Sequence, residues 1–342
     1  MLRRIFLDVR ERLGVEGAKR RHIFDKLEPL SEAEVERLVP EPSYGSLRND
    51  LDAYLLDWLE KADGEPTRLI LYPPASRERF LTGWAEQHGL KVLPCREGLH
   101  TDPEWADKML AEIAAKGLVV IPDLHNGFLR TRGGLEAVSQ LLTAISASPS
   151  KVVVGCNSYA WAFLTKAVNA HHFLPDPGVP QALDGARLRA WFREACTDAK
   201  ATFHSLSTGG DVFADADPFF DDLAIASLGT PWSAWSLWRE SLFTRPDSPE
   251  GHIWVKLPKS PTLPRADRRQ SLLILHSLLI HGGLSPDALA RTLPSNVPHS
   301  ELAQLRREGI VGLVDGILDV TAKAYPMVRT ALVDANHPVD GL

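Results

Sequence analysis

Polar residues follow three apolar segments of this sequence, at positions where a parallel sheet binds ligands. The loop Pro73–Arg79 follows the first segment, Asp123 the second and Asn157 the third. A carboxylate at such a position can hold Mg²⁺, and an amide can contact a terminal phosphate. A loop between a strand and a helix binds phosphates when it supplies glycines, a lysine and a hydroxyl. The three positions are therefore candidates for phosphate chemistry.

The segments that carry these residues alternate with helices. We expect strands at 69–72, 90–93, 118–121 and 151–155, and helices at about 77–88, 103–116, 133–147 and 159–168. The strands are rich in Val, Ile and Leu without polar alternation, which is typical of strands buried on both faces. The pattern predicts an α/β fold whose parallel sheet has helices on both faces, with ligands at the carboxyl ends of the strands.

The order of a strand and loop, an acid-ended strand and an Asn-ended strand resembles the AAA+ ATPases and the related STAND group. Residues 183–192 resemble the helix that opens the small α-helical lid of that family, and 219–235 resemble its segment that usually reads Gly-Asn-Pro-Arg. The resemblance spans about residues 65–245 and implies a P-loop NTPase-like sheet. It also implies that Asp123 is the Mg²⁺ ligand and Asn157 the γ-phosphate sensor.

The loop departs from the family pattern at the positions that bind nucleotide. Where the family reads Gly, Ser, Gly, Lys and Ser, this chain reads Ala75, Ser76, Arg77, Glu78 and Arg79. Arg77 does not readily adopt the positive φ that glycine permits. Glu78 replaces the phosphate-binding lysine and would repel a triphosphate. In the lid, Trp232 stands where the family has a sensor arginine.

These departures predict a pseudo-ATPase with a degenerate Walker A motif, no catalytic residue and no bound ATP or Mg²⁺. Two positions keep a second interpretation. Asp123 is also the residue type that caps a turn after a strand, and Asn157 is a favoured N-cap for the following helix. The tryptophans at 232, 235 and 238 fall on one helical stripe, which indicates core packing or a hydrophobic partner surface.

Composition limits the classes of protein to which this chain can belong. The chain has 342 residues, 44% of them hydrophobic, and a formal net charge of −6, as expected of a globular protein with more than one domain. The net charge argues against a protein that coats nucleic acid. Cys95, Cys156 and Cys196 show no CxxC spacing, so we expect no disulfide framework, no metal site and a cytoplasmic location. No apolar run is long enough to span a membrane.

The pattern divides the chain into five parts. We expect a basic amphipathic arm at 1–28, the α/β core at 29–175, the helical lid at 176–245, a proline-rich linker with one strand at 246–265, and a winged-helix domain at 266–342. The arm either packs on its own protein or docks on a partner or, peripherally, on an anionic membrane surface. The winged helix is indicated by three helices followed by a hairpin with an Asp315-Gly316 turn.

The third helix of this domain would read DNA. It offers the side chains of His299, Ser300, Gln304, Arg306 and Arg307. Glu301 and Glu308 share the helix, however, and eight basic residues from 265 onward are balanced by eight acidic ones. Since a duplex binder should present a basic face, the balance favours a protein partner.

The sequence thus predicts a non-catalytic AAA+/STAND-like scaffold or regulatory subunit that acts through protein partners, such as a paralogous ATPase subunit. One alternative is a DNA-binding winged-helix regulator. The second alternative is an ATPase with an atypical nucleotide loop.

Overall fold

The chain forms two compact units in a computed structural model. The structure describes residues 27–40, 45–61, 65–74, 80–95, 105–116, 118–246, 248–264, 268–294 and 299–339. The first unit comprises 1–42, 183–225 and 234–259, and the second comprises 43–182, 226–233 and 260–342. Most of the predicted arm (1–26) and the loop positions Ala75, Ser76, Arg77, Glu78 and Arg79 lie outside the described residues.

The second unit is built on the predicted parallel sheet. Its strands are β2 (Thr67–Tyr72), β3 (Lys91–Val92), β4 (Leu118–Ile121) and β5 (Lys151–Asn157), in the order β2-β5-β4-β3. Every neighbouring pair is parallel. Beyond β2 the sheet continues through one residue, because Gly178 exchanges hydrogen bonds of 2.8 and 2.9 Å with the backbone of Leu69 and Leu71.

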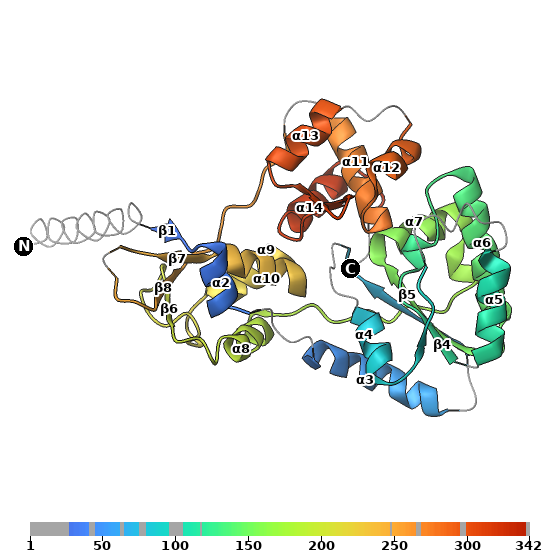
Figure 1. Cartoon of the computed structure of the whole chain (residues 1–342), viewed down its shortest axis with the longest axis horizontal. Coiled ribbons are helices and arrows are strands. Elements are labelled where there is room, and N and C mark those ends of the chain that lie inside the picture. The colour runs from blue at the N-terminus through green and yellow to red at the C-terminus, as the bar shows by residue number, and fades with distance from the viewer. Residues whose placement is uncertain are drawn as a thin grey trace, which may run out of the picture. The chain divides into compact units, whose positions relative to one another are not determined.

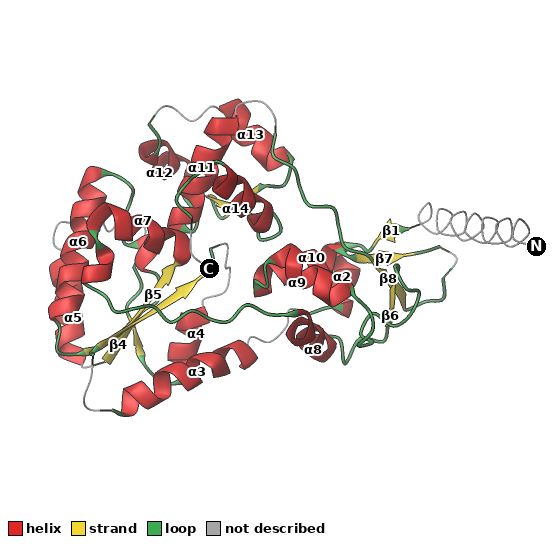
Figure 2. Ribbon diagram, turned by 180° about the vertical axis from the view of Figure 1, so that it is seen from behind, coloured by secondary structure: helices red, strands yellow, loops and turns green. Residues whose placement is uncertain are grey.

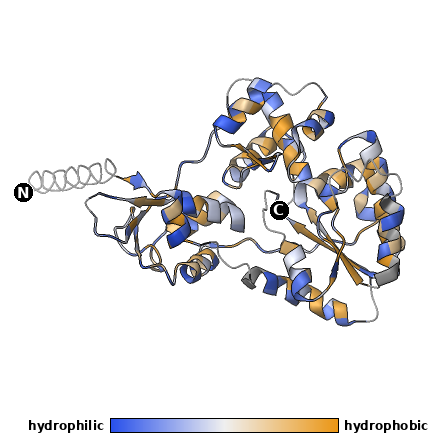
Figure 3. Ribbon diagram, in the orientation of Figure 1, coloured by the Kyte–Doolittle hydropathy of each residue, from blue (hydrophilic) through white to orange (hydrophobic). Residues whose placement is uncertain are grey.

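Helices cover both faces of this sheet, as Figure 1 shows. The helices are α3 (Gly45–Glu60), α4 (Phe80–Gln87), α5 (Trp105–Lys116), α6 (Arg132–Ala147) and α7 (Ser158–Val168). The chain crosses the sheet one way from β2 to β3 and returns through β4 to β5. Because such crossovers are right-handed, α4 lies on one face and α5 and α6 on the other. The strands are almost entirely apolar (Figure 3), which places the core on both faces of the sheet.

The C-terminal part of this unit is a winged helix. It comprises α11 (Arg268–His281), α12 (Pro286–Thr292), α13 (His299–Arg307), β9 (Val311–Val314), β10 (Ile317–Val320) and α14 (Tyr325–Asp334). The predicted Asp315-Gly316 turn is confirmed, since both residues have positive φ (50° and 81°), as a two-residue hairpin requires. Residues 274–281 of α11 are all buried, because the helix lies between the rest of the winged helix and the α/β core.

The first unit combines helices with a second, mixed sheet, drawn in yellow in Figure 2. The order β1-β7-β8-β6 brings together Glu28–Pro29, Leu242–Thr244, His252–Val255 and Thr202–Ser205. The helices of this unit are α2 (Glu32–Leu38), α8 (Gly185–Ala195), α9 (Phe219–Ser227) and α10 (Pro231–Glu240). The end of α9 and the start of α10 fall within 226–233, which belongs to the second unit. Ser31 and Glu34 form the predicted capping box of α2.

The first unit contains the helices that we expected in the lid. Its boundaries differ from those expected for the lid, the linker and the start of the α/β core. The predicted strand in the 246–265 linker is β8, which is the partner of β6 and β7. Residues 29–40, which we expected to open the α/β core, belong to this unit because β1 pairs with β7. Such pairing joins residues about two hundred positions apart, so no local pattern reveals it.

An aromatic cluster forms the core of the first unit. Trp238 is fully buried, and its ring centroid lies 5.3–5.8 Å from those of five phenylalanines, namely Phe192, Phe203, Phe213, Phe219 and Phe220. For Trp238, the expectation of core packing is confirmed. Aromatic side chains provide much of the buried apolar area of a small unit.

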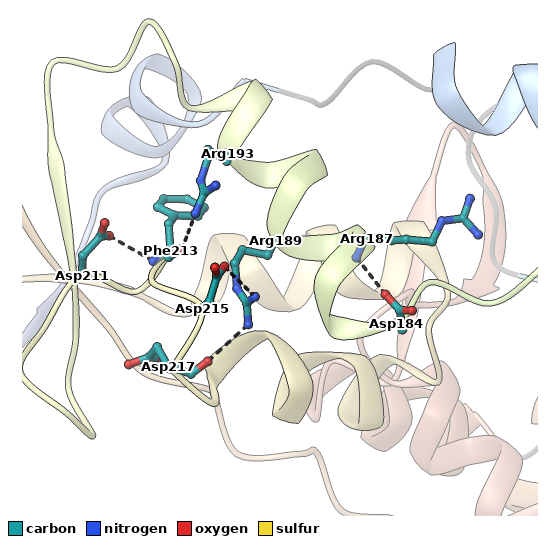
Figure 4. A network of polar contacts seen from close by, with 8 residues as sticks. All are labelled: Asp184, Arg187, Arg189, Arg193, Asp211, Phe213, Asp215 and Asp217. Carbon is teal, nitrogen blue, oxygen red and sulfur yellow. Dashed lines mark hydrogen bonds and ion pairs between the residues drawn. The ribbon is translucent and has the colours of Figure 1, made fainter.

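Arginines of α8 hold the loop that leads to α9 (Figure 4). The Arg193 guanidinium donates to the carbonyl of Phe213, and Arg189 lies 3.4 Å from the Asp215 carboxylate and 3.5 Å from the Asp217 carbonyl. Asp211 accepts from the backbone of Phe213 at 3.0 Å. The acidic residues of this loop are thus used to fix its conformation on α8.

Candidate functional site

The carboxyl edge of the parallel sheet brings together two of the predicted site residues and a tyrosine. Tyr72 ends β2 and is the register partner of Asn157 at the end of β5. Asp123 follows β4, the strand next to β5. The sequence therefore places Asp123 and Asn157 at one edge, as expected of a ligand-binding edge.

The Asp123 carboxylate is in contact with Tyr72. The Tyr72 hydroxyl lies 2.7 Å from the carbonyl oxygen of Pro122 and 3.2 Å from Asp123 Oδ1. Burial, and then the negative charge of Asp123, raise the pKa of Tyr72 well above its usual value. The phenol therefore stays protonated and donates to the edge of β4. Asp123 makes no side-chain capping bond to the 3-10 turn that follows it.

Asn157 points both of its amide atoms into the protein. Its Oδ1 accepts from the backbone N–H of Ala160 at 2.7 Å, which confirms its role as the N-cap of α7. Its Nδ2 donates to the carbonyl of Ile280, in the last turn of α11, at 3.1 Å. With 1% of its surface exposed, this residue is covered by the winged helix.

The end of α11 lies directly on the strand ends. Gly282 has φ of +63°, and a Cβ there would stand 2.9 Å from the ring of His125, which follows β4. The ring of His281 packs 5.0 Å from that of Phe128, and the N–H of Arg130 points at His281 Nε2 from 3.4 Å. The close approach of residue 282 to His125 explains why this residue is a glycine, because any side chain there would collide with the ring.

Two buried histidines of the second unit are held neutral. Burial lowers the pKa of His125 to about 4, although the nearby charge of Asp123 opposes the shift. Burial also lowers the pKa of His276 in α11 to about 4, against the effect of its 2.8 Å contact with the Pro338 carbonyl. No local sequence pattern marks these histidines or Arg130, since their partners are about 60 to 160 residues away.

Trp232, at the position of the expected sensor arginine, reaches the segment that follows β2. Its Nε1 donates to the carbonyl of Pro74 at 3.1 Å. The next residue, Ser233, donates to the carbonyl of Ala322 at 2.7 Å, in the turn before α14. The segment 226–233 therefore links the end of β2 with the winged helix inside the second unit.

A cavity of about 570 Å³ opens beside Trp232, within the second unit. It is lined by the end of β2, the start of α4, the segments 179–182 and 228–232, and two residues of α14, Tyr325 and Arg329. Its volume is that of a small-molecule site, and most lining side chains are apolar or aromatic. No sequence motif marks it, because five separate segments build it.

The candidate DNA contacts share the outer face of α13. His299, Ser300, Arg306 and Arg307 are exposed, and Gln304 is half-buried. Glu301 is buried and accepts a hydrogen bond from Ser271 of α11. It therefore does not face a ligand and, contrary to the expectation from the sequence, does not weigh against DNA binding.

Metal sites, reactive thiols and membrane-spanning helices were also sought in the part of the chain that the structure describes. There, no three His, Cys, Asp or Glu side chains are grouped so that they could hold a metal ion. Burial raises the pKa of Cys196 to about 12 and raises those of Cys95 and Cys156 further, so none of these thiols is activated. No described helix is both long and apolar enough to cross a membrane.

No protein-family model matches this chain, and no curated protein matches it. Among solved structures, the RuvB Holliday junction branch migration motor of Thermotoga maritima is 13% identical with a TM-score of 0.36, covering 85% of this chain and 98% of its own. Cdc6p of Pyrobaculum aerophilum is 12% identical with a TM-score of 0.36, covering 90% and 98%. The Walker-type ATPase of Pyrococcus abyssi is 12% identical with a TM-score of 0.35, covering 84% and 95%. At these scores, the assignment of a P-loop NTPase-like sheet followed by a winged helix rests on the strand order and the element order described above.

Proposed function

We propose that this protein is a non-catalytic, AAA+/STAND-like scaffold or regulatory subunit that acts in the cytoplasm through protein partners. The observation that carries the proposal is the double engagement of Asn157. The amide that would sense a γ-phosphate caps α7 and holds the end of α11 instead. A buried polar side chain with both atoms satisfied is a structural element of the fold.

The sequence of the loop supports the same conclusion independently. Glu78 stands where a lysine would bind phosphate, and Arg79 where a hydroxyl would bind Mg²⁺. The test is calorimetric titration of the full chain with ATP and Mg²⁺, for which we expect no saturable binding. Micromolar binding would refute the proposal and favour an ATPase with an atypical loop.

A loop-restored variant sharpens this test. It carries Ala75→Gly, Arg77→Gly, Glu78→Lys and Arg79→Ser, which return the loop to the family pattern. If the loop alone had been lost, this variant would bind ATP. We expect this variant not to bind ATP, because α11 also covers the carboxyl ends of β4 and β5, where the Mg²⁺ ligand and the γ-phosphate sensor would act.

The wing is the surface that we assign to a protein partner. At its tip Leu313 and Val314 are 43% and 53% exposed, and Asp315 stands in the turn. A wing that contacts a phosphate backbone carries basic side chains, whereas exposed apolar groups beside an acid suit a protein surface. A paralogous subunit with a complementary basic and apolar face is the partner that this chemistry favours.

Comparative pull-downs from native cells test the partner surface. We expect the wild-type chain and an Arg306→Glu, Arg307→Glu variant to retain the same partner at the same yield. A Leu313→Ser, Val314→Ser variant should lose it. Retention of the partner by the wing variant would refute the assignment.

DNA binding is the second candidate, and the burial of Glu301 favours it. With that carboxylate turned to Ser271, the outer face of α13 presents Arg306 and Arg307 with Glu308 as the neighbouring acid. Duplex binding at low salt that falls steeply with salt, and disappears in the Arg306→Glu, Arg307→Glu variant, would establish it. Absence of binding at low salt would exclude it.

A further inference from the structure

The hydrogen bonds of the wing determine which backbone groups of β9 face outward. At the base of the hairpin, the N–H of Thr321 donates to the carbonyl of Ile310 at 2.9 Å. Hydrogen-bonded pairs alternate with non-bonded pairs along antiparallel strands, so every second residue of β9 bonds to β10. The other two residues, Val311 and Leu313, therefore point their N–H and C=O groups away from β10.

The edge of β9 that carries these groups is open. Among the residues that the structure describes, no backbone group bonds to Val311 or Leu313 on that side. The opposite edge of the wing is closed, because Leu318 of β10 exchanges backbone bonds of 2.8 and 2.9 Å with Leu284. This exchange agrees with the alternation, since Leu318 is the register partner of Leu313 and also faces outward.

The two larger sheets end differently. The parallel sheet is continued beyond β2 by Gly178, and the mixed sheet is continued beyond β6 by the segment 210–212, with bonds of 2.8 and 3.0 Å. The strands at their other ends, β1 and β3, are each two residues long. Native proteins close or shorten sheet edges in these ways because an open edge is a template for pairing. The four-residue strand β9 keeps its edge open, with Leu313 and Val314 exposed on it.

We propose that this edge of β9 pairs with the same edge of a second copy of this chain. Outward N–H and C=O groups in alternation match another extended backbone. Two identical edges related by a twofold axis meet antiparallel and present the same groups to each other. In the register centred on Gly312, the Val311 of each copy exchanges hydrogen bonds with the Leu313 of the other, so every outward group of both residues is used.

This register also suits the side chains of the wing. Gly312 lies on the twofold axis, where the Cα atoms of the two copies approach to about 4.5 Å. The exposed side chains of Leu313 and Val314 in one copy lie along the strand of the other. The two Asp315 carboxylates stand at opposite ends of the paired strands, about 20 Å apart, which is beyond the reach of a screened repulsion.

The pairing deepens the proposed function, and it rests on the assignment there of the wing to a protein partner. A paralogous subunit that carries the same open edge would pair with β9 in the same way as a second copy. The second copy is the occupant that can be measured with the purified chain alone.

Sedimentation equilibrium of the full chain, without nucleotide, measures the self-association. Because one strand edge is a small interface, we expect a weak dimer with a dissociation constant of about 10–200 µM. Leu313→Pro removes an outward N–H and leaves the bonds within the hairpin, so it should weaken the dimer about tenfold or more at an unchanged unfolding temperature. The control Leu313→Val keeps both the donor and an apolar side chain and should pair as the wild type does. If the proline variant is less stable, Leu313→Lys replaces it, since it adds like charges at the interface.

Gly312→Cys tests the register. The nearest atom to a Cβ at this position is Thr321 Cγ2, at 3.5 Å, so the substitution fits without strain. In the proposed pairing the two new cysteines face each other in a non-bonded pair, within the span that a disulfide bridges. Under mild oxidation we expect a covalent dimer about ten times faster or more than for Val333→Cys, an exposed position on α14. The native cysteines are buried and do not interfere.

Three results would overturn the proposal. The first is a wild-type chain that stays monomeric up to about 0.5 mM. The second is equal self-association of the wild type and Leu313→Pro. The third is a covalent dimer of Gly312→Cys that forms no faster than that of Val333→Cys. If the wild type is monomeric and Leu313→Pro loses its partner in the pull-down, the edge takes a strand of that partner and not of a second copy. A failure of the pairing leaves the ATP titration unaffected, so it is distinguishable from a failure of the proposed function.

Discussion

Replacing Asn157 with serine, alanine and aspartate separates the two hydrogen bonds that its side chain makes. Serine keeps an oxygen that can cap α7 but cannot donate to the Ile280 carbonyl. Alanine removes both bonds. Aspartate keeps the cap but directs a buried negative oxygen at that carbonyl.

The structure gives the size of each effect. Loss of an N-cap costs about 1 kcal/mol. A buried carbonyl left without its donor costs about 1–3 kcal/mol. We therefore expect Asn157→Ser to lower the free energy of unfolding by about 1–3 kcal/mol and Asn157→Ala by about 2–4 kcal/mol. Asn157→Asp adds an unpaired buried charge and should cost about 3–5 kcal/mol.

Urea unfolding followed by circular dichroism measures this order. With a slope of about 3 kcal/mol/M, a loss of 3 kcal/mol lowers the midpoint by about 1 M. The control Asn49→Ala, at an exposed position of α3, should change stability by less than about 0.5 kcal/mol. An Asn157→Ala midpoint equal to that of the wild type would refute the reasoning, since an open phosphate sensor could be removed at little cost.

Three further perturbations test the packing of the second unit. Because the pKa values of His125 and His276 are lowered to about 4, the unfolded chain binds protons first on acidification, so stability should fall between about pH 6.5 and 4, by roughly 3 kcal/mol per histidine. Urea midpoints across that range check it, and a His125→Gln, His276→Gln variant should lose this part of the slope. Lys151→Met should cost about 1–3 kcal/mol in the same urea assay, because the ammonium donates to three carbonyls at the end of α3 at 2.6–2.9 Å. In calorimetric melting, Gly282→Ala should cost more than about 1 kcal/mol, and equal stability would contradict the contact with His125.

The sequence predicted the elements whose signals are local. The parallel strands were readable because β-branched residues run without alternation, and the wing because Asp315-Gly316 fits its turn. The capping box at Ser31 and the N-cap at Asn157 were also readable, since each partner lies three residues away. Their physical causes act within one turn or one strand.

What the sequence did not predict depends on contacts between distant segments. The pairing of β1 with β7 makes residues 29–40 part of the first unit. The burial of Glu301 depends on a hydroxyl thirty residues earlier. The cavity beside Trp232 needs five segments at once. A periodic pattern records which face of a helix is apolar, but it does not record which partner covers that face.

The position of α11 also bears on how a partner could act on this protein. Moving α11 away from the strand ends, together with α12, would break the bonds from Asn157 to Ile280 of α11 and from Arg130 to Thr292 of α12. It would also expose the apolar faces of residues 274–281, which are buried over their whole length. Each broken bond to a buried carbonyl costs about 1–3 kcal/mol, and the exposed side chains add to that cost. A γ-phosphate contact at this edge would have to offset the sum, whereas binding to the outward-facing wing disturbs none of these contacts. We therefore infer that α11 stays on the sheet and that partners engage the wing.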